Sequence, residues 1–265
     1  MKRAVGLSVL LAGLLLPLVP IAVWAVSREW RYPALTPRSY SLRAVRLLAA
    51  PETEVLRGLL TSATIASAVA LIASLIGLSA GRALGLYAFR GKRLVQFLVL
   101  APVIVPGLAV SLGIQVLFIR YRIADTAPGV VLVHLIPTVP YVTYVMASVY
   151  STYDVSYEEQ ARVLGASPFQ TFRAVTLPAI FPGLVVAALF AFLISWSEYL
   201  LTLLVGGGTV KTLPLVLFAF LRGADLSVAA ALSLVFILPP LLLLVITSRY
   251  LSGDRGQALV GFSRL

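Results

Sequence analysis

Long apolar segments, about six in number, dominate this chain and limit what it can fold into. A helix needs about 20 mostly apolar residues to cross the hydrocarbon core of a bilayer. The segments are Val5–Val26, Leu59–Ala80, Leu94–Ile119, Gly129–Tyr150, Ala179–Val205 and Val228–Ser248. Only 12% of the residues are charged, too few to cover a soluble domain of this size. The sequence therefore predicts an all-α, polytopic membrane protein with about six transmembrane helices.

The two ends of the chain flank a helical core. We interpret residues 1–56 as an N-terminal transmembrane helix and outer loop, residues 57–251 as the core, and residues 252–265 as a tail. The first apolar segment is longer than the apolar part of a cleavable signal peptide, which indicates a retained helix. In the outer loop, Ser41–Ala50 is predicted to lie along the membrane surface with its arginines at headgroup level.

The net charge of +11 comes from 21 basic and 10 acidic residues. The basic residues are dispersed among apolar segments, which favours contact with anionic lipid headgroups over nucleic-acid binding. They are divided almost evenly between the two sides of the membrane, so the positive-inside rule does not fix the orientation. With no cysteine and one histidine, neither a disulfide framework nor a transition-metal site is expected.

Prolines and small residues lie inside several of the predicted spans. Proline facing lipid would leave a backbone carbonyl without a partner, so these prolines are predicted to mark kinks packed within protein. They are Pro102, Pro106, Pro137 and Pro140. Small residues recur along Thr61–Gly81 and predict close packing of this helix against a neighbour. They are Ser62, Ala66, Ala70, Ala73, Gly77 and Gly81.

The segment 151–178 is too polar to lie in lipid and predicts two capped helices, an arrangement that we call the elbow. Ser156 and Glu159 have the spacing of a capping box, and Gly165 is a typical C-terminal stop. Ser167-Pro168 with Gln170 predicts a second capping box, which places Phe169, Phe172 and Val175 or Thr176 on one face. The residues alone leave two interpretations open: a docking surface for a soluble partner, and an amphipathic hairpin at the membrane surface.

The elbow resembles the EAA loop of the inner-membrane permeases of bacterial ABC importers. That pattern is Glu-Ala-Ala, three residues, Gly, nine residues, Ile, one residue and Leu-Pro. This chain has Glu159-Gln160-Ala161, Gly165, Val175 and Leu177-Pro178 at the same spacings. The two departures are Gln for Ala and Val for Ile. The resemblance runs from Gly58 to Leu251 and is nearer to the polyamine, iron and phosphonate branch than to the maltose branch.

The resemblance implies a type I ABC importer permease fold in a bacterial or archaeal plasma membrane, with the elbow and both termini in the cytoplasm. It implies as partners two ATPase subunits, a second permease of the same or a related kind, a solute-binding protein and membrane lipid. It also implies that the elbow docks on the ATPase, with Glu159 as the charged contact and Gly165 as the hinge. The docking residues would be Glu159, Ala161, Gly165, Ala166, Phe169, Phe172, Leu177 and Pro178.

ATP is expected to bind to a partner, because this chain has no Walker A sequence. That motif is Gly, four residues, then Gly-Lys-Ser/Thr, and the nearest segment, Gly85–Arg93, has one residue too many and arginine in place of the hydroxyl. The chain is therefore expected to be a transport subunit, not an enzyme, with no cofactor or metal of its own.

Polar residues inside the spans supply candidates for the solute pathway. Glu198, flanked by Ser195 and Ser197, is predicted to face either a translocation cavity or a basic partner near the membrane surface. The two serines are expected to hydrogen-bond between helices, and His134 to serve packing or a backbone hydrogen bond in preference to a proton relay. Lys211–Pro214 begins a re-entering segment after the outer turn 206–209.

Three other classes of protein fit the sequence less well. An ion-coupled secondary transporter needs coupling residues and often an internal repeat. An intramembrane enzyme needs clustered carboxylates, a histidine pair or a Ser/Lys dyad. A membrane adaptor would recruit an ATPase without moving a solute.

Overall fold

The computed structural model describes residues 13, 15–30, 33–105, 107–223 and 225–251. They form two compact units, which we describe separately. Unit 1 consists of the described residues of Met1–Ser62 and Lys211–Leu241, and unit 2 of those of Ala63–Val210 and Leu242–Leu265. The helices α4 (Val55–Leu86) and α13 (Leu226–Leu251) contribute residues to both units.

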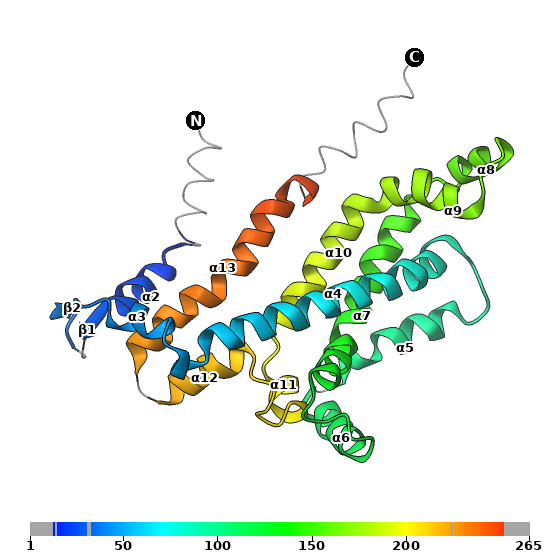
Figure 1. Cartoon of the computed structure of the whole chain (residues 1–265). Coiled ribbons are helices and arrows are strands. Elements are labelled where there is room, and N and C mark those ends of the chain that lie inside the picture. The colour runs from blue at the N-terminus through cyan, green and yellow to red at the C-terminus, as the bar shows by residue number, and fades with distance from the viewer. Residues whose placement is uncertain (1–12, 14, 31–32, 106, 224, 252–265) are drawn as a thin grey trace, which may run out of the picture. The chain divides into compact units, whose positions relative to one another are not determined.

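Unit 1 combines helices with a small hairpin (Figure 1). Its elements are α2 (Leu18–Ala25), β1 (Ser27–Glu29), β2 (Ser39–Tyr40), α3 (Arg43–Leu48), the 3₁₀ turn η1 (Pro51–Thr53), α12 (Leu213–Arg222) and parts of α4 and α13. The two strands pair antiparallel. The core contains Ala25, Ala44, Val228 and Ala231. Of the predicted first span, residues 5–12 and 14 lie outside the described residues, and α2 forms its last part.

The predicted surface segment Ser41–Ala50 contains α3. Ala44 is buried, and Leu47 and Leu48 pack against the same core cluster. Arg43, Val45 and Arg46 are exposed. The helix thus has one face in the core of unit 1 and one face of mixed arginine and apolar side chains, which is the pattern of a helix lying at a membrane surface. Its place relative to lipid stays a prediction.

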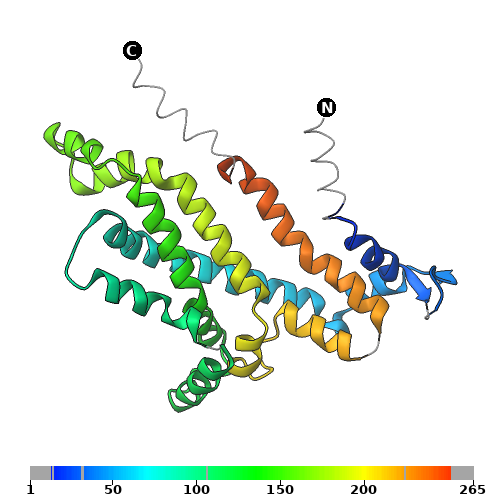
Figure 2. The ribbon, with the colours of Figure 1, turned by 180° about the vertical axis from the view of Figure 1, so that it is seen from behind.

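Unit 2 is built around two long helices, α7 (Ala127–Ser151) and α10 (Leu177–Ser197), which pack against each other. Shorter helices surround the pair: α5 (Lys92–Ile104), α6 (Gly107–Arg120), α8 (Ser156–Val163), α9 (Pro168–Thr171), the π-helical turn η2 (Phe172–Thr176) and α11 (Leu200–Val205). Figures 1 and 2 both place α8 and α9 beyond one end of α7 and α10, and α6 and α11 near the other end of α7. One of its core clusters consists of Ala73, Val142, Met146, Tyr150, Ile180, Ala187 and Ala191.

Glycines every fourth residue bring α4 into close contact with α7. A Cβ atom added at Gly77 would lie against Val142, one at Gly81 against Met146, and one at Gly85 2.7 Å from the Cβ of Tyr150. Successive contacts lie about one helical turn apart, and the residue numbers rise together on both helices. The helices α4 and α7 are therefore parallel. This confirms the close packing predicted from the small residues, because only glycine lets the two backbones approach so closely.

Within the described residues, four helices are long and apolar enough to cross a membrane: Val55–Leu86, Ala127–Ser151, Pro168–Ser197 and Leu226–Ser248. They match four of the six predicted spans. Pro140 is buried and Pro137 half-buried within α7, which confirms that these prolines pack against protein. The all-α membrane fold is thus confirmed, while two of the predicted spans are interrupted.

Two of the predicted spans, Leu94–Ile119 and Ala179–Val205, are each divided into two helices. The first is divided into α5 and α6 at Val105, which is extended at φ −72° and ψ 137°. Val105 precedes a proline, and the proline ring disfavours helical geometry for the residue before it. In the second span, α10 ends at Ser197, Glu198 is extended at ψ 115°, and α11 begins at Leu200.

Candidate functional site

The elbow occupies the end of unit 2 where α7 stops and α10 begins. The first elbow helix, α8, begins at Ser156, and the Asp154 carboxylate accepts a hydrogen bond from the Ser156 backbone N–H at 2.9 Å. This bond lowers the pKa of Asp154. The predicted capping box of Ser156 with Glu159 is therefore wrong. Asp154 makes a local turn bond to the residue two positions on, so Ser156 is already inside the helix.

The second half of the elbow begins with the predicted capping box, but its helix passes into the η2 turn after Thr171, and Thr176 is buried against Glu158 and does not join exposed Phe169 and Phe172 on one face. The Ser167 hydroxyl accepts from the Gln170 N–H, and the Gln170 side chain accepts from the Ser167 N–H, at 3.3 and 2.8 Å. Pro168 is the first residue of α9. Gly165 has φ +90°, a left-handed conformation that glycine adopts without strain, which confirms it as the stop between the two helices.

Glu158 ties the elbow to α4. Its side chain is only 3% exposed, and its two oxygens accept from the two terminal nitrogens of Arg82 at 2.7 Å each. The Thr176 hydroxyl donates to the same carboxylate at 2.7 Å, and Arg162 lies 3.5 Å away. The Arg82 guanidinium also lies over the ring of Tyr150, 5.7 Å from its centroid. One carboxylate thus joins α4, α8 and the η2 turn.

The electrostatics of this cluster keep Glu158 ionised. The hydrogen bonds from Arg82 hold the pKa of Glu158 at about 2, against an ordinary value of 4.5, and they outweigh the opposing effect of burial. Burial raises the pKa of the neighbouring Tyr153. A bidentate pair between guanidinium and carboxylate fixes orientation as well as charge. The cluster therefore acts as a rigid attachment of the elbow, which we call the Glu158 clamp (Arg82, Glu158, Arg162 and Thr176).

The outer surface of the elbow is exposed and partly apolar. Glu159 is exposed and lines a shallow hollow with Ser156, Gln160, Val163 and Leu164. Val163 and Leu164 are each 87% exposed. Of the predicted docking residues, Gly165, Phe169, Phe172 and Pro178 are exposed, and Ala161, Ala166 and Leu177 are half-buried.

Sequence reasoning missed Val163, Leu164 and the clamp. Two apolar residues that follow the last charged residue of a polar helix are the signal for the first two. An arginine inside the predominantly apolar helix α4 is the signal for the clamp, because such a charge requires a partner.

The polar residues near Glu198 form a second cluster. The His134 ring lies 2.8 Å from the Ser195 hydroxyl and 2.9 Å from the Thr202 hydroxyl, and all three residues are buried. This confirms that His134 is packed in the interior and that Ser195 makes an interhelical bond. The partners of the His134 ring are two hydroxyls, where a backbone bond was the predicted alternative to packing. The prediction of an interhelical bond for Ser197 is wrong, because its hydroxyl donates to carbonyls of its own helix at Leu193 and Ile194.

Glu198 lies in the break between α10 and α11. Its carboxylate accepts from the N–H of Leu201 at 3.0 Å, and its backbone carbonyl accepts from the Thr202 hydroxyl at 3.1 Å. Among the ion pairs of the described residues none involves Glu198, so the alternative of a basic partner is not supported there. The described residues also include no group of three metal-ligating side chains.

The long apolar helices and the clamped elbow between two of them define a helical membrane protein with a polar elbow outside its spans. The fold is similar to that of a bacterial ABC transporter involved in the import of the acidic polysaccharide alginate, with a TM-score of 0.67, 19% identity and 94% of this chain and 95% of that chain covered. Residues 73–252 match the family "Binding-protein-dependent transport system inner membrane component". The chain therefore belongs to this family, which confirms the resemblance seen in the elbow.

Curated relatives include polyamine permeases. The chain is 32% identical over 168 residues to the putrescine transport system permease protein PotI of Escherichia coli K12, a match that covers 61% of this chain and 60% of PotI. It is 29% identical over 186 residues to the spermidine/putrescine transport system permease protein PotC of Haemophilus influenzae, covering 70% of this chain and 72% of PotC. The matched region thus spans less than two thirds of PotI.

Proposed function

We propose that this chain is the membrane-spanning permease subunit of an ATP-binding-cassette importer. Membership of the binding-protein-dependent transport family carries the proposal. In this account the chain pairs with a second permease of the same or a related kind. Two ATPase subunits bind the elbows from the cytoplasm, where both termini also lie, and a solute-binding protein delivers solute at the opposite face.

We propose that the exposed face of the elbow is the ATPase contact. Two carboxylates, Glu158 and Glu159, are adjacent in the sequence, and one is fully engaged in the clamp. Glu159 is exposed and stands beside exposed Val163 and Leu164. Protein interfaces combine an apolar core with a polar rim, and exposed Val163 and Leu164 beside the charged Glu159 match that composition. Glu159 is therefore the charged contact, and Val163 and Leu164 supply the apolar part of the surface.

The clamp gives this contact a mechanical consequence. Because Glu158 is bonded both to Arg82 and to Thr176, a displacement of the elbow moves α4 and the start of α10 together. Closure of the ATPase pair on ATP would pull the elbows and shift the bundle between two packed arrangements that open to opposite sides. Nucleotide binding biases such a two-state equilibrium by its different affinity for the two arrangements.

We propose a small solute and test polyamines first, because PotI and PotC are named as putrescine and spermidine permeases. Glu198 is the candidate solute contact: it is half-buried, its carboxylate lies where α10 is interrupted, and Ser195 and Ser197 are its neighbours in the same segment. A carboxylate at an interrupted helix suits a cationic solute. If Glu198→Gln leaves uptake of labelled putrescine by the assembled complex unchanged, this role for Glu198 is wrong.

The experiment for the main proposal is co-purification of the detergent-solubilised chain with its ATPase. Glu159→Lys reverses the proposed contact, and Gly165→Pro disturbs the angle between the two elbow helices. Glu29→Lys, an equal charge reversal at an exposed carboxylate of β1, is the matched control. We expect a protein with a Walker A sequence to co-purify with the wild type and the control, and to be lost from both elbow variants. Equal retention by all four proteins would contradict the docking role.

A further inference from the structure

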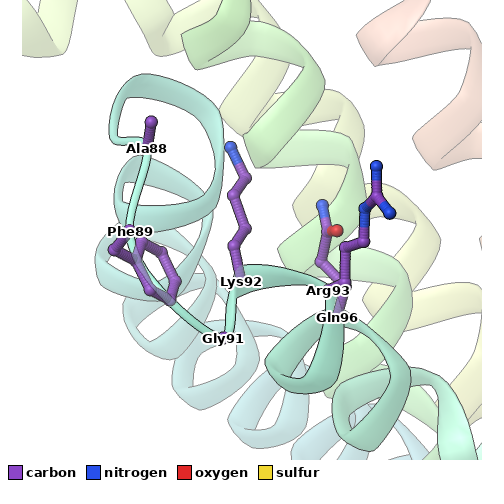
Figure 3. A pocket seen from close by; sticks show the side chains of 6 residues that line it. All are labelled: Ala88, Phe89, Gly91, Lys92, Arg93 and Gln96. Atoms are coloured by element: carbon purple, nitrogen blue, oxygen red, sulfur yellow. The ribbon is translucent and has the colours of Figure 1, made fainter.

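The turn between α4 and α5 carries a cluster of cations that the proposed function does not use. We define the basic turn as residues 87–96. Lys92 and Arg93 form the first turn of α5, and Arg90 precedes them. Figure 3 shows Lys92 and Arg93 extending to the same side of the turn, with the amide of Gln96 beside Arg93. The hollow there is lined by Ala88, Phe89, Gly91, Lys92, Arg93 and Gln96.

The positive charge of the basic turn has no counter-charge from nearby sequence. The sequence contains no acidic residue from Val55 to Ala124. In the described part of the chain, the ion pairs of unit 2 both involve Glu158, with Arg82 and Arg162 as its partners. The Lys92 ammonium donates to the backbone carbonyl of Tyr87 at 3.1 Å, a neutral acceptor that leaves its charge uncompensated. Two cations at the start of a helix are also repelled by the helix dipole, which makes a bound anion favourable.

The position of the basic turn selects the kind of anion. It follows α4, one of the membrane-crossing helices, and α5 continues with exposed apolar side chains at Leu94, Phe97 and Leu98. Two exposed aromatic side chains, Tyr87 and Phe89, lie on the turn itself. Aromatic and basic side chains at the end of an apolar span are typical of the lipid headgroup region. The Tyr144 hydroxyl donates a hydrogen bond to the Gln96 carbonyl. This bond attaches α5 to α7 and so keeps the basic turn in place.

We propose that the basic turn binds the phosphate of an anionic phospholipid headgroup. Lys92 and Arg93 contact the phosphate, and the acyl chains lie along the exposed apolar face of α5. Arg90 adds charge at the rim, and Tyr87 and Phe89 pack at the level of the glycerol. Basic sites beside transmembrane helices bind anionic headgroups by this combination of charge and apolar contact. The site is independent of the ATPase contact, because the exposed face of the elbow shares no residue with it.

The test compares lipid retention by the full chain. Wild type, Lys92→Gln/Arg93→Gln and the control Arg28→Gln/Arg38→Gln are purified from mixed micelles of phosphatidylglycerol and phosphatidylcholine. Retained lipid is then counted by native mass spectrometry. Each double variant removes two exposed or half-exposed cations, but only the first lies in the basic turn. We expect the first variant to retain phosphatidylglycerol at least about 10-fold more weakly than wild type, because each headgroup-level cation contributes substantially to the attraction. The control should retain it like wild type.

Three results would overturn the proposal: equal phosphatidylglycerol retention by wild type and the Lys92→Gln/Arg93→Gln variant, equal preference for phosphatidylcholine, and displacement of the lipid by millimolar inorganic phosphate, which would identify a free-anion site. If the variant does not fold, the wild type alone decides by its salt dependence. Retention of phosphatidylglycerol that falls between 0.1 and 1 M salt, while that of phosphatidylcholine does not, supports the site. Retention that is independent of salt contradicts it.

Discussion

The Glu158 clamp makes a quantitative prediction about the elbow. Its carboxylate has a pKa of about 2 in the folded chain, against 4.5 for an ordinary glutamate. That difference corresponds to about 3 kcal/mol in favour of the ionised, bonded form at neutral pH. Removing one partner of a buried ion pair costs roughly 3–5 kcal/mol, in agreement. Glu158→Gln keeps the shape of the side chain and removes its charge, so we expect it to destabilise the attachment of the elbow by about 3 kcal/mol.

Amide hydrogen exchange in detergent-solubilised protein at pH 7 measures this effect locally. A loss of about 3 kcal/mol raises exchange of the α8, α9 and η2 amides on the order of 100-fold if these helices open as one unit. Glu159→Gln is the matched control, because it makes the same chemical change one residue away on an exposed side chain. We expect it to exchange like wild type. Equal exchange in the Glu158→Gln variant and in wild type would refute the clamp.

A double-variant cycle tests whether the effect belongs to the pair. Arg82→Gln should destabilise the elbow by a similar amount, since it leaves Glu158 buried without its main partner. The double variant should be less destabilised than the sum of the two single variants, because both remove the same interaction. Additive losses would mean that the two residues act independently.

Three further predictions concern pH, packing and the hinge. Because folding lowers the pKa of Glu158, the stability that its carboxylate gives the elbow is fully present above about pH 4.5 and is lost as pH falls toward 2. Elbow unfolding followed by circular dichroism should show this loss, and the Glu158→Gln variant should lack the pH dependence. Gly81→Ala should lower thermal stability by roughly 1–3 kcal/mol through overlap with Met146, whereas Gly113→Ala, with open space around its Cβ, should not; equal melting temperatures would contradict the packing. Gly165→Ala should cost about 1 kcal/mol of elbow stability through backbone strain alone, and Gly165→Asn less; an unchanged Gly165→Ala melting curve would exclude the left-handed hinge.

Local interactions explain why much of the elbow could be predicted from sequence. The capping box of Ser167 and Gln170 and the left-handed Gly165 depend on residues within four positions of one another. The same holds for the small-residue face of α4, whose spacing of four residues is visible in the sequence. Such features need no knowledge of the tertiary fold.

Features that depend on distant residues could not be predicted in the same way. Which of two adjacent glutamates is buried is decided by Arg82, 76 residues before Glu158. The interruption at Glu198 has no proline or glycine signal. It coincides with a hydrogen bond from the Leu201 N–H to the Glu198 carboxylate and with the buried cluster around His134. At Val105, by contrast, the following proline is a visible signal, from which a kink but not a complete interruption of the helix was predicted.

Site-directed cross-linking tests the central proposal, that the elbow docks an ATPase, most directly. The chain contains no cysteine, so a single Leu164→Cys variant carries the only site for a photoactivatable maleimide. Leu35→Cys, at a 93% exposed position of unit 1, is the matched control for the 87% exposed Leu164. We expect position 164 in native membranes to cross-link to a protein with a Walker A sequence, in a yield that changes when ATP is added, and position 35 not to do so. Absence of that protein from the position 164 products, or equal cross-linking from both positions, would contradict the account.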